Sequence, residues 1–284
     1  MIFKHKLDGV LAGKLSQLHD APKQLFYRGV DPNLLLNKPS VAIVGSRKMT
    51  AYGKTVAEQF ARELAQAGVV IISGLALGVD SAAHRATVEA GGLTLAVMAH
   101  GLHTVQPSSH VGLAQQILQG GGTLVSEYPV DYPALSHNFV ARDRLIAALA
   151  DAVLIPEAAV KSGSLHTAAF ALDLGKPVLA VPGPITSEMS AGTNQLIKTG
   201  ALTVTSVDDV FLALNLQKTS LQQTLLPASD EEQLVLEALR AGATEGQQLM
   251  AVSGLSSTIY SQTMTMLEIS GQIRALGGDK WALY

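Results

Sequence analysis

The sequence contains no cysteine among its 284 residues. Disulfide bonds, thiolate metal sites and cysteine nucleophiles are therefore excluded. The chain also lacks any apolar run of the roughly 18 residues that a membrane-spanning helix needs. Its first residues show neither the apolar segment nor the cleavage site of a signal peptide. We therefore expect a soluble, cytoplasmic protein with no membrane attachment.

Charge is also scarce: charged residues make up 15% of the chain and the net charge is −3. Composition alone therefore does not indicate a nucleic-acid binder. No Lys or Arg occurs between Arg85 and Arg142, and residues 230–284 sum to −4, which leaves +1 for the rest. A phosphate site would have to gather a few cations at one place, and the part before residue 230 is the better candidate.

Hydrophobic residues make up 48% of the chain. After a mixed lead-in, residues 1–38, short apolar runs alternate with segments of helical period from residue 39 to residue 214. This alternation predicts an α/β domain with a mostly parallel sheet and helices on both faces. The expected strands are Val41–Val44, Val69–Ile72, Thr94–Met98, Thr123–Val125, Ala152–Ile155 and Val178–Val181. The expected helices are Tyr52–Ala67, Val79–Ala90, Val111–Gln119, Val140–Ala150 and Ser164–Leu174.

The C-terminal part has a different pattern. Residues 215–229 are rich in Gln, Ser and Thr, as a linker is. Residues 230–284 predict a winged-helix domain, with helices Asp230–Ala241, Glu245–Ser253 and Ser256–Ile269, then a hairpin of Gln272–Ala275 and Lys280–Leu283. The expected recognition helix, Ser256–Ile269, contains no Lys or Arg, so we expect a protein-interaction or regulatory module rather than a reader of duplex DNA.

The loops that follow the strands carry the candidate site, because ligands of open α/β sheets bind at the carboxyl ends of the strands. After the first strand, Gly45 allows close approach of a ligand, Ser46 offers a hydroxyl and Arg47 a planar donor group suited to phosphate. Alternatively, Gly45 is only a turn and Arg47 a surface charge.

The second loop is rich in glycine and opens a helix, which suits an anion-binding turn. Its candidate binding residues are Ser73, Gly74, Leu75, Ala76 and Gly78. For Asp80 we expect helix capping rather than catalysis, and for His84 a place in the packing or in a polar network.

The third and fourth segments combine aromatic, basic and hydroxyl groups. Around a helix entry, the candidates are Asn138, Phe139, Arg142 and Arg144. Phe139 would stack on a base while an arginine takes a phosphate, with an ordinary core aromatic as the alternative. Because Arg142 and Arg144 are two apart, only one faces the ligand if both are helical. The fourth segment offers Lys161, Ser162, Gly163, Ser164 and Thr167, with helix capping by a serine as the alternative.

With these residues in view, the sequence resembles the DprA/Smf family of DNA-processing proteins. The motifs that carry the resemblance run from about Leu15 to Leu214 and include VAIVGSR, SGLALGVDSAAH, FVARDRLIAALA, PEAAVKSGSLHTAAFAL and AGTNQLIKTGA. The resemblance implies an extended Rossmann-like fold and binding of single-stranded DNA without enzymatic activity or cofactor. It also implies a homodimer formed through this domain, and a role in loading the RecA recombinase during natural transformation.

The chain departs from the family pattern in two loops. The usual Arg-Asn-Arg appears as Arg142-Asp143-Arg144, which places an anion beside the expected phosphate contacts. The usual Gly-x-Gly-Leu-Asp loop appears as MAHGLHTVQP, residues 98–107. Its histidines, with His110, lack the carboxylates or cysteines that would indicate a metal site, so no metal is expected.

Two other functions remain open. A LOG-like nucleotide phosphoribohydrolase would carry a PGGxGTxxE motif, but this chain has VPGPITSEMSAGTNQLI at that place. A sensor of a small nucleotide-derived ligand would use the same loops without binding DNA. Affinity that grows with oligonucleotide length would favour the DNA-binding function over both.

Overall fold

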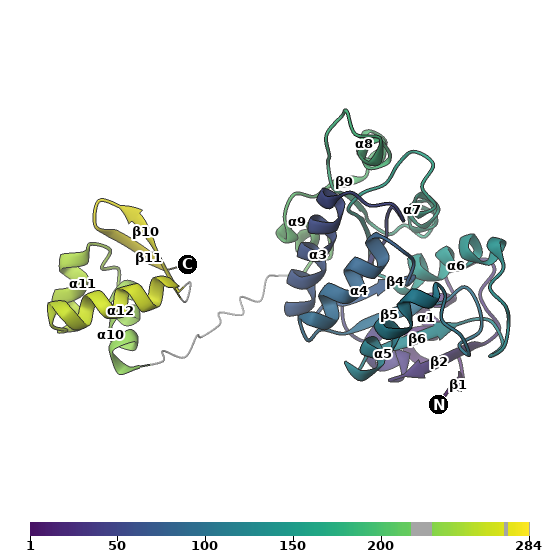
Figure 1. The fold of residues 1–284 in the computed structure, drawn as a ribbon, viewed down its shortest axis with the longest axis horizontal. Coiled ribbons are helices and arrows are strands. Elements are labelled where there is room, and N and C mark those ends of the chain that lie inside the picture. The colour runs from purple at the N-terminus through teal and green to yellow at the C-terminus, as the bar shows by residue number, and fades with distance from the viewer. Residues whose placement is uncertain (217–228, 270–271, 284) are drawn as a thin grey trace. The chain divides into compact units, whose positions relative to one another are not determined.

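The computed structural model describes residues 1–216, 229–269 and 272–283. The chain divides into two compact units, Met1–Gln217 and Lys218–Tyr284, hereafter the first and second units (Figure 1). Apart from residues 215, 216 and 229, the expected linker lies outside the described residues.

Among the described residues, the first unit builds one nine-stranded sheet in the order β1-β2-β6-β5-β4-β3-β7-β8-β9. From β6 to β9 every neighbouring pair is parallel, whereas β2 is antiparallel to β6 and β1 to β2. The mostly parallel sheet is therefore confirmed. The strands are β1 Phe3–His5, β2 Leu25–Gly29, β3 Ser40–Ile43, β4 Val70–Ser73, β5 Thr94–Val97, β6 Thr123–Ser126, β7 Ala152–Ile155, β8 Val178–Ala180 and β9 Leu202–Thr203.

Helices cover both faces of this sheet (Figure 1). Along β3, Ala42 packs in one apolar cluster with α1, α2, α6 and α7, while its neighbours Val41 and Ile43 pack in another with α3, α4 and α9. This alternation follows from the two-residue period of a strand. The helices are α1 Gly9–Leu15, α2 Pro32–Leu36, α3 Ala51–Gln66, α4 Val79–Glu89, α5 Val111–Gln119, α6 Ser136–Leu149, α7 Ser164–Asp173, α8 Ala191–Lys198 and α9 Val207–Ala213.

The N-terminal lead-in, residues 1–38, is part of the first unit. Its strands β1 and β2 extend the sheet beyond β6, and Leu11 and Leu15 of α1 are buried in the core. The Lys14 ammonium pairs with the Asp151 carboxylate, which also accepts hydrogen bonds from the backbone and hydroxyl of Ser40. These contacts hold helix α1 against the beginnings of β3 and β7.

The second unit contains three helices followed by an antiparallel hairpin, as the sequence predicted for a winged helix. They are α10 Asp230–Arg240, α11 Gly246–Ser253, α12 Ser257–Ile269, β10 Ile273–Gly277 and β11 Lys280–Leu283. Val235, Leu249, Leu267 and Ile273 are among the residues of its small core. None of the helices in the described part of the chain has the length and apolar character needed to cross a membrane.

Candidate functional site

A pocket of about 640 Å³ opens where the strand order of the sheet reverses. In chain order β4 and β5 lie on one side of β3, while β7 and β8 lie on the other. Such a switch point is the usual ligand site of open α/β sheets. The lining residues of this switch-point pocket are Val44, Gly45, Ser46, Arg47, Lys48, Ala76, Asp80, Ser136, Phe139, Val140, Arg142, Asp143, Ala159, Lys161, Ser162, Gly163, Ser164, Thr167 and Met189.

The loop after β3 is held in place through its backbone. The Ser46 N–H donates to the Glu157 carbonyl at 2.9 Å, and the Ser46 carbonyl accepts from the Val79 N–H at 3.2 Å. Gly78, with φ of +81°, lets this close approach occur, since a Cβ there would lie 2.1 Å from the Ser46 carbonyl oxygen. The fixed backbone leaves the side chains of Arg47 and Lys48 exposed at the pocket.

The Ser46 hydroxyl is already engaged, contrary to its expected role as a free donor. It accepts from the Lys48 N–H at 3.1 Å and donates to the Met189 sulfur at 3.6 Å. Ser46 lines the pocket but is only 6% exposed. Its main action is to shape the turn that presents Arg47 and Lys48.

Glu157, which the sequence analysis did not select, fixes the next part of this loop. Its carboxylate is buried and accepts from the Thr50 N–H at 2.8 Å and from the Thr50 hydroxyl at 2.6 Å. Gly53 makes room for it, because a Cβ at Gly53 would lie 2.3 Å from the Glu157 Oε2 atom. The signal in the sequence was an acidic residue two positions after a fully buried strand.

The glycine-rich loop after β4 serves mainly as structural support. Ser73 is fully buried and its hydroxyl donates to the Ile43 carbonyl at 2.6 Å. The Gly74 N–H donates to the Asp80 carboxylate at 3.0 Å, so this amide is not available to an anion. Asp80 therefore organises the loop before its own helix instead of capping that helix. Burial raises the pKa of the Asp80 carboxyl, against the opposing effect of Arg142.

His84 takes part in a buried polar network, as predicted. It has no exposed surface, and its Nδ1 atom lies 2.7 Å from the Thr94 hydroxyl. Burial lowers the pKa of His84 to about 3, which keeps the ring neutral. Of the loop histidines, His100 and His110 are buried and His103 is exposed. Across the described ranges, no three His, Asp or Glu side chains gather as metal ligands would.

Helix α6 starts at Ser136, four residues before the predicted Val140, so Arg142 and Arg144 are both helical. Arg142 lines the pocket, whereas the buried Arg144 binds Glu127 and Asp20 away from it. Of the two arginines expected to bind phosphate, Arg142 alone lines the pocket. Arg142 itself is 3% exposed, and its Nη1 atom donates to the carbonyls of Gly74 and Val97 at 2.8 and 2.5 Å.

Six of the predicted binding residues do not line the pocket. Leu75 and Asn138 are buried, Gly78 packs on the loop after β3, and Arg144 is held by two carboxylates. The pocket instead receives residues that had not been selected, among them Lys48 and Met189. The predicted residues that lie outside it are Ser73, Gly74, Leu75, Gly78, Asn138 and Arg144.

One face of α6 forms a wall of the pocket. Ser136, Phe139, Val140 and Asp143 share that face, since they follow the three- and four-residue spacing of a helix. Phe139 is half-buried, and the Arg47 guanidinium carbon lies 5.5 Å from the centre of its ring. An aromatic ring and a cation therefore meet at this wall, from elements that are far apart in the sequence.

The loop after β7 supplies the opposite wall. The hydroxyls of Ser162 and Ser164 lie 2.8 Å apart and bond to each other, and neither caps α7. Among the described residues, the N–H groups of Gly163 and Ser164 have no partner, so they remain available to an anion at the start of α7. Lys161 is exposed beside them.

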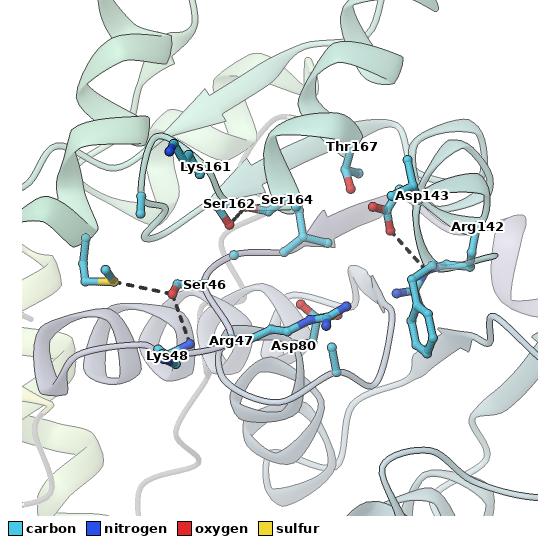
Figure 2. A pocket seen from close by; sticks show the side chains of 18 of the residues that line it. Ser46, Arg47, Lys48, Asp80, Arg142, Asp143, Lys161, Ser162, Ser164 and Thr167 are labelled. Atoms are coloured by element: carbon cyan, nitrogen blue, oxygen red, sulfur yellow. Dashed lines mark hydrogen bonds and ion pairs between the residues drawn. The ribbon is translucent and has the colours of Figure 1, made fainter. Parts of the chain in front are cut away.

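Charge is unevenly distributed along the pocket. Figure 2 shows Lys48, Lys161, Ser162 and Ser164 towards one side and Asp143 with Arg142 towards the other. The Arg142 Nε atom donates to the Asp143 Oδ1 atom at 3.1 Å. Burial nevertheless raises the pKa of Asp143 to about 6, because desolvation outweighs the attraction of Arg142 and the Asp80 carboxylate adds repulsion.

Comparison with known proteins agrees with this architecture. The family model for DNA recombination-mediator protein A matches residues 6–215, and the model for the DprA winged helix domain matches residues 217–279. Protein Smf of Escherichia coli is 44% identical over 191 residues, which cover 67% of this chain and 50% of that protein. DNA processing protein DprA of Streptococcus pneumoniae is 41% identical over 205 residues, 72% of this chain and 71% of that protein. The chain thus spans about half the length of the Escherichia coli relative.

Two solved structures are also similar. DNA processing protein A from Streptococcus pneumoniae has a TM-score of 0.68 and 39% identity, covering 75% of this chain and 73% of that one. The Helicobacter pylori protein, described for its single-stranded DNA binding mode, has a TM-score of 0.68 and 34% identity, covering 76% of this chain and 96% of that one. The chain belongs to the DNA recombination-mediator protein A family, the family that its resemblance to DprA and Smf proteins indicated.

Proposed function

We propose that this chain binds single-stranded DNA in the switch-point pocket and takes part in DNA processing through that activity. The observation that carries the proposal is the meeting of exposed Arg47, Lys48 and Lys161 with Phe139 around one cavity. Cations that follow the backbone and an aromatic ring that stacks on a base are the usual means of holding a single strand. The Helicobacter pylori relative, described for this kind of binding, supports the same assignment.

The phosphates would lie along the basic side of the pocket. There the exposed Lys48 and Lys161 supply charge, and the N–H groups of Gly163 and Ser164 supply fixed donors. Thr167 and Arg142 also line the cavity, although Arg142 acts mainly on the protein backbone. A base would stack on Phe139 once Arg47 moves off the ring to reach a phosphate.

The decisive measurement is a binding series with oligo-thymidines of increasing length, set beside free nucleotides. Affinity should rise until the strand fills the site and then level off. A protein that senses or hydrolyses a nucleotide would instead bind the free nucleotide as tightly as the long strand. That result, or turnover of the nucleotide, would refute the proposal.

Further parts of the proposal rest on family membership. We propose that the chain works without catalysis or a cofactor, acts in the cytoplasm as a homodimer through its first unit, and passes DNA to the RecA recombinase. The family description as a recombination mediator supports this role. Recombinase filament formation on strands coated with a single-strand-binding protein, with and without this chain, would test it.

The second unit is proposed as a protein-interaction or regulatory module. Its helix α12 carries no Lys or Arg, and residues 230–284 sum to −4. Without cations the electrostatic part of DNA affinity is missing. Full-length chain that binds duplex DNA as tightly as single strands would argue against this role.

A further inference from the structure

The side of the pocket formed by α6 differs chemically from the phosphate-binding side. Asp143 lies four residues after Phe139, so the two side chains are neighbours on one helix face, and both line the cavity. The Asp143 side chain is 13% exposed, and Figure 2 shows it on the side away from Lys48 and Lys161. We call Phe139, Asp143 and Thr167 the acidic side of the pocket.

A phosphate group does not fit this side. An ionised carboxylate only accepts hydrogen bonds and repels another anion. Arg142 does not offer such an anion a hydrogen bond, because its guanidinium is held by the carbonyls of Gly74 and Val97 and by Asp143 itself. A ligand group placed here must therefore offer hydrogen-bond donors.

The carboxylate still has capacity to accept them. Arg142 bonds only the Oδ1 atom, and within the described parts of the chain the Oδ2 atom of Asp143 has no partner. Thr167, from α7, adds a hydroxyl to the wall of the same side, where the residue is 1% exposed. The chemistry on offer is thus a two-oxygen acceptor, one hydroxyl that donates or accepts, and an aromatic face.

From this arrangement we infer that the acidic side is a base-binding subsite that prefers guanine, with Asp143 as the residue that determines the preference. The inference rests on the proposed binding of single-stranded DNA. A base stacked on Phe139 directs its edge along the helix face on which Asp143 follows. The Watson–Crick edge of an unpaired base is then read by side-chain hydrogen bonds.

Guanine matches the carboxylate best among the four bases. Its N1–H and N2–H groups are adjacent donors, so they pair with the two oxygens of a carboxylate, and its O6 atom accepts from a hydroxyl such as that of Thr167. Adenine and cytosine each present a single amino group beside an acceptor. Thymine presents one N–H between two carbonyl oxygens, which the carboxylate repels.

The test uses oligo-thymidines of about a dozen residues, a length within the range of known single-strand sites. One central position carries thymine, guanine or hypoxanthine. Hypoxanthine keeps the N1–H donor of guanine and lacks only the 2-amino group. Affinities are measured by fluorescence anisotropy at pH 7.5 and fixed salt for the full chain, for Asp143→Asn and for Asp173→Asn. Asp173 is an exposed acid at the end of α7, outside the pocket lining, so its variant controls for net charge.

With the unaltered chain, the guanine strand should bind on the order of tenfold more tightly than the thymine strand, as a good two-bond pair allows. The hypoxanthine strand should show little of this increase in affinity over the thymine strand. Asp143→Asn should remove the preference for guanine while binding the thymine strand at least as well, and Asp173→Asn should leave the preference unchanged.

Equal affinity of the unaltered chain for the guanine and hypoxanthine strands would overturn the inference. This comparison does not depend on whether a variant folds. A guanine preference that survives in Asp143→Asn would overturn the role of Asp143. In both cases the strands still bind, so the proposed function stands. Failure of all three strands to bind would refute the proposed function, and the inference with it.

Discussion

The Arg47 guanidinium carbon lies 5.5 Å from the centre of the Phe139 ring, which places a cation from the loop after β3 over an aromatic residue of α6. Such a contact stabilises an exposed pair by about 0.5–1 kcal/mol. In the proposed function both groups act on the strand, the guanidinium on a phosphate and the ring on a base. The contact therefore has to loosen when DNA binds.

This relationship predicts that Arg47→Ala and Phe139→Ala do not act independently. Each should weaken oligo-thymidine binding by about 1–3 kcal/mol, through a lost charged hydrogen bond or a lost stacking contact. In the double variant the loss should differ from the sum of the two by at least about 0.5 kcal/mol. Fluorescence anisotropy titrations at one salt concentration measure the affinity of the unaltered chain, the two single variants and the double variant.

Arg62→Ala is the matched control for this cycle, since Arg62 is an exposed arginine of α3 that does not line the pocket. It should leave affinity unchanged. Strictly additive effects of the two pocket variants would show that Arg47 and Phe139 do not cooperate.

The salt dependence of binding should report the number of exposed cations in the pocket. Single strands release about 0.7 counterions per phosphate contact, so contacts from Arg47, Lys48 and Lys161 give a log–log slope of about −2. Lys48→Gln or Lys161→Gln should each make the slope about 0.7 less steep. Lys38→Gln is the control, because exposed Lys38 precedes β3 at the opposite end of that strand. A log–log slope near zero would show that the pocket cations do not contact the phosphates of the strand.

Affinity for oligo-thymidine should rise as the pH falls from about 7.5 to about 5.5. The Asp143 carboxyl has its pKa raised from 3.8 to about 6, so it is ionised at the upper pH and largely protonated at the lower one. Protonation removes an anion from the pocket. Guanine preference should weaken over the same range, because a protonated carboxyl no longer accepts with both oxygens.

The charged groups that act on Asp143 are Arg142, Asp80 and His166. Asp143→Asn should flatten the pH profile, whereas His166→Gln tests a histidine that acts on the same carboxyl. If Asp143→Asn leaves the pH dependence of oligo-thymidine affinity unchanged, another titrating group causes that dependence. Since the folded-state pKa is raised, the contribution of Asp143 to stability is complete below about pH 3.8 and is lost as the pH rises through about 6.

Glu157→Ala should damage both stability and binding. It removes the acceptor of the Thr50 N–H and hydroxyl bonds, which leaves half-buried donors without their partner at a cost of about 1 kcal/mol. The loop that presents Arg47 and Lys48 then loses the part of its support that comes from the Glu157 side chain, while the backbone bonds of Ser46 remain. Chemical denaturation and DNA titration of the same preparation would measure the two effects. Unchanged affinity would mean that the loop keeps its shape without Glu157.

The strands of the parallel sheet were predictable because buried strands are short and almost wholly apolar. Ala152–Ile155 was predicted to the residue, and most of the predicted helix ends lie within one residue of the observed ones. Helix α6 was the exception. Its first turn, from Ser136 to Phe139, carries polar and aromatic residues that do not show a helical apolar stripe, so the pattern only emerged at Val140.

The candidate site was predictable as a set of loops but not atom by atom. Strand order brings the loops after β3 and β7 together, and this follows from the fold class. Whether Ser73 or Ser162 faces the cavity depends on single hydrogen bonds, from Ser73 to Ile43 and between Ser162 and Ser164, which leave no periodic trace in the sequence. Met189 comes from a short turn after β8 and carried no signal at all.

The buried position of Arg142 has a consequence for how mutational data on this pocket are interpreted. Its guanidinium joins the ends of β4 and β5 through two carbonyls, and only the protein itself receives those bonds. Removing the Arg142 side chain would deform the part of the pocket near Gly74 and Val97. DNA affinity would then fall even if no nucleotide contacts Arg142. An alanine scan scored on binding alone would count this arginine as a DNA contact, and a parallel measurement of folding stability would reveal its structural role.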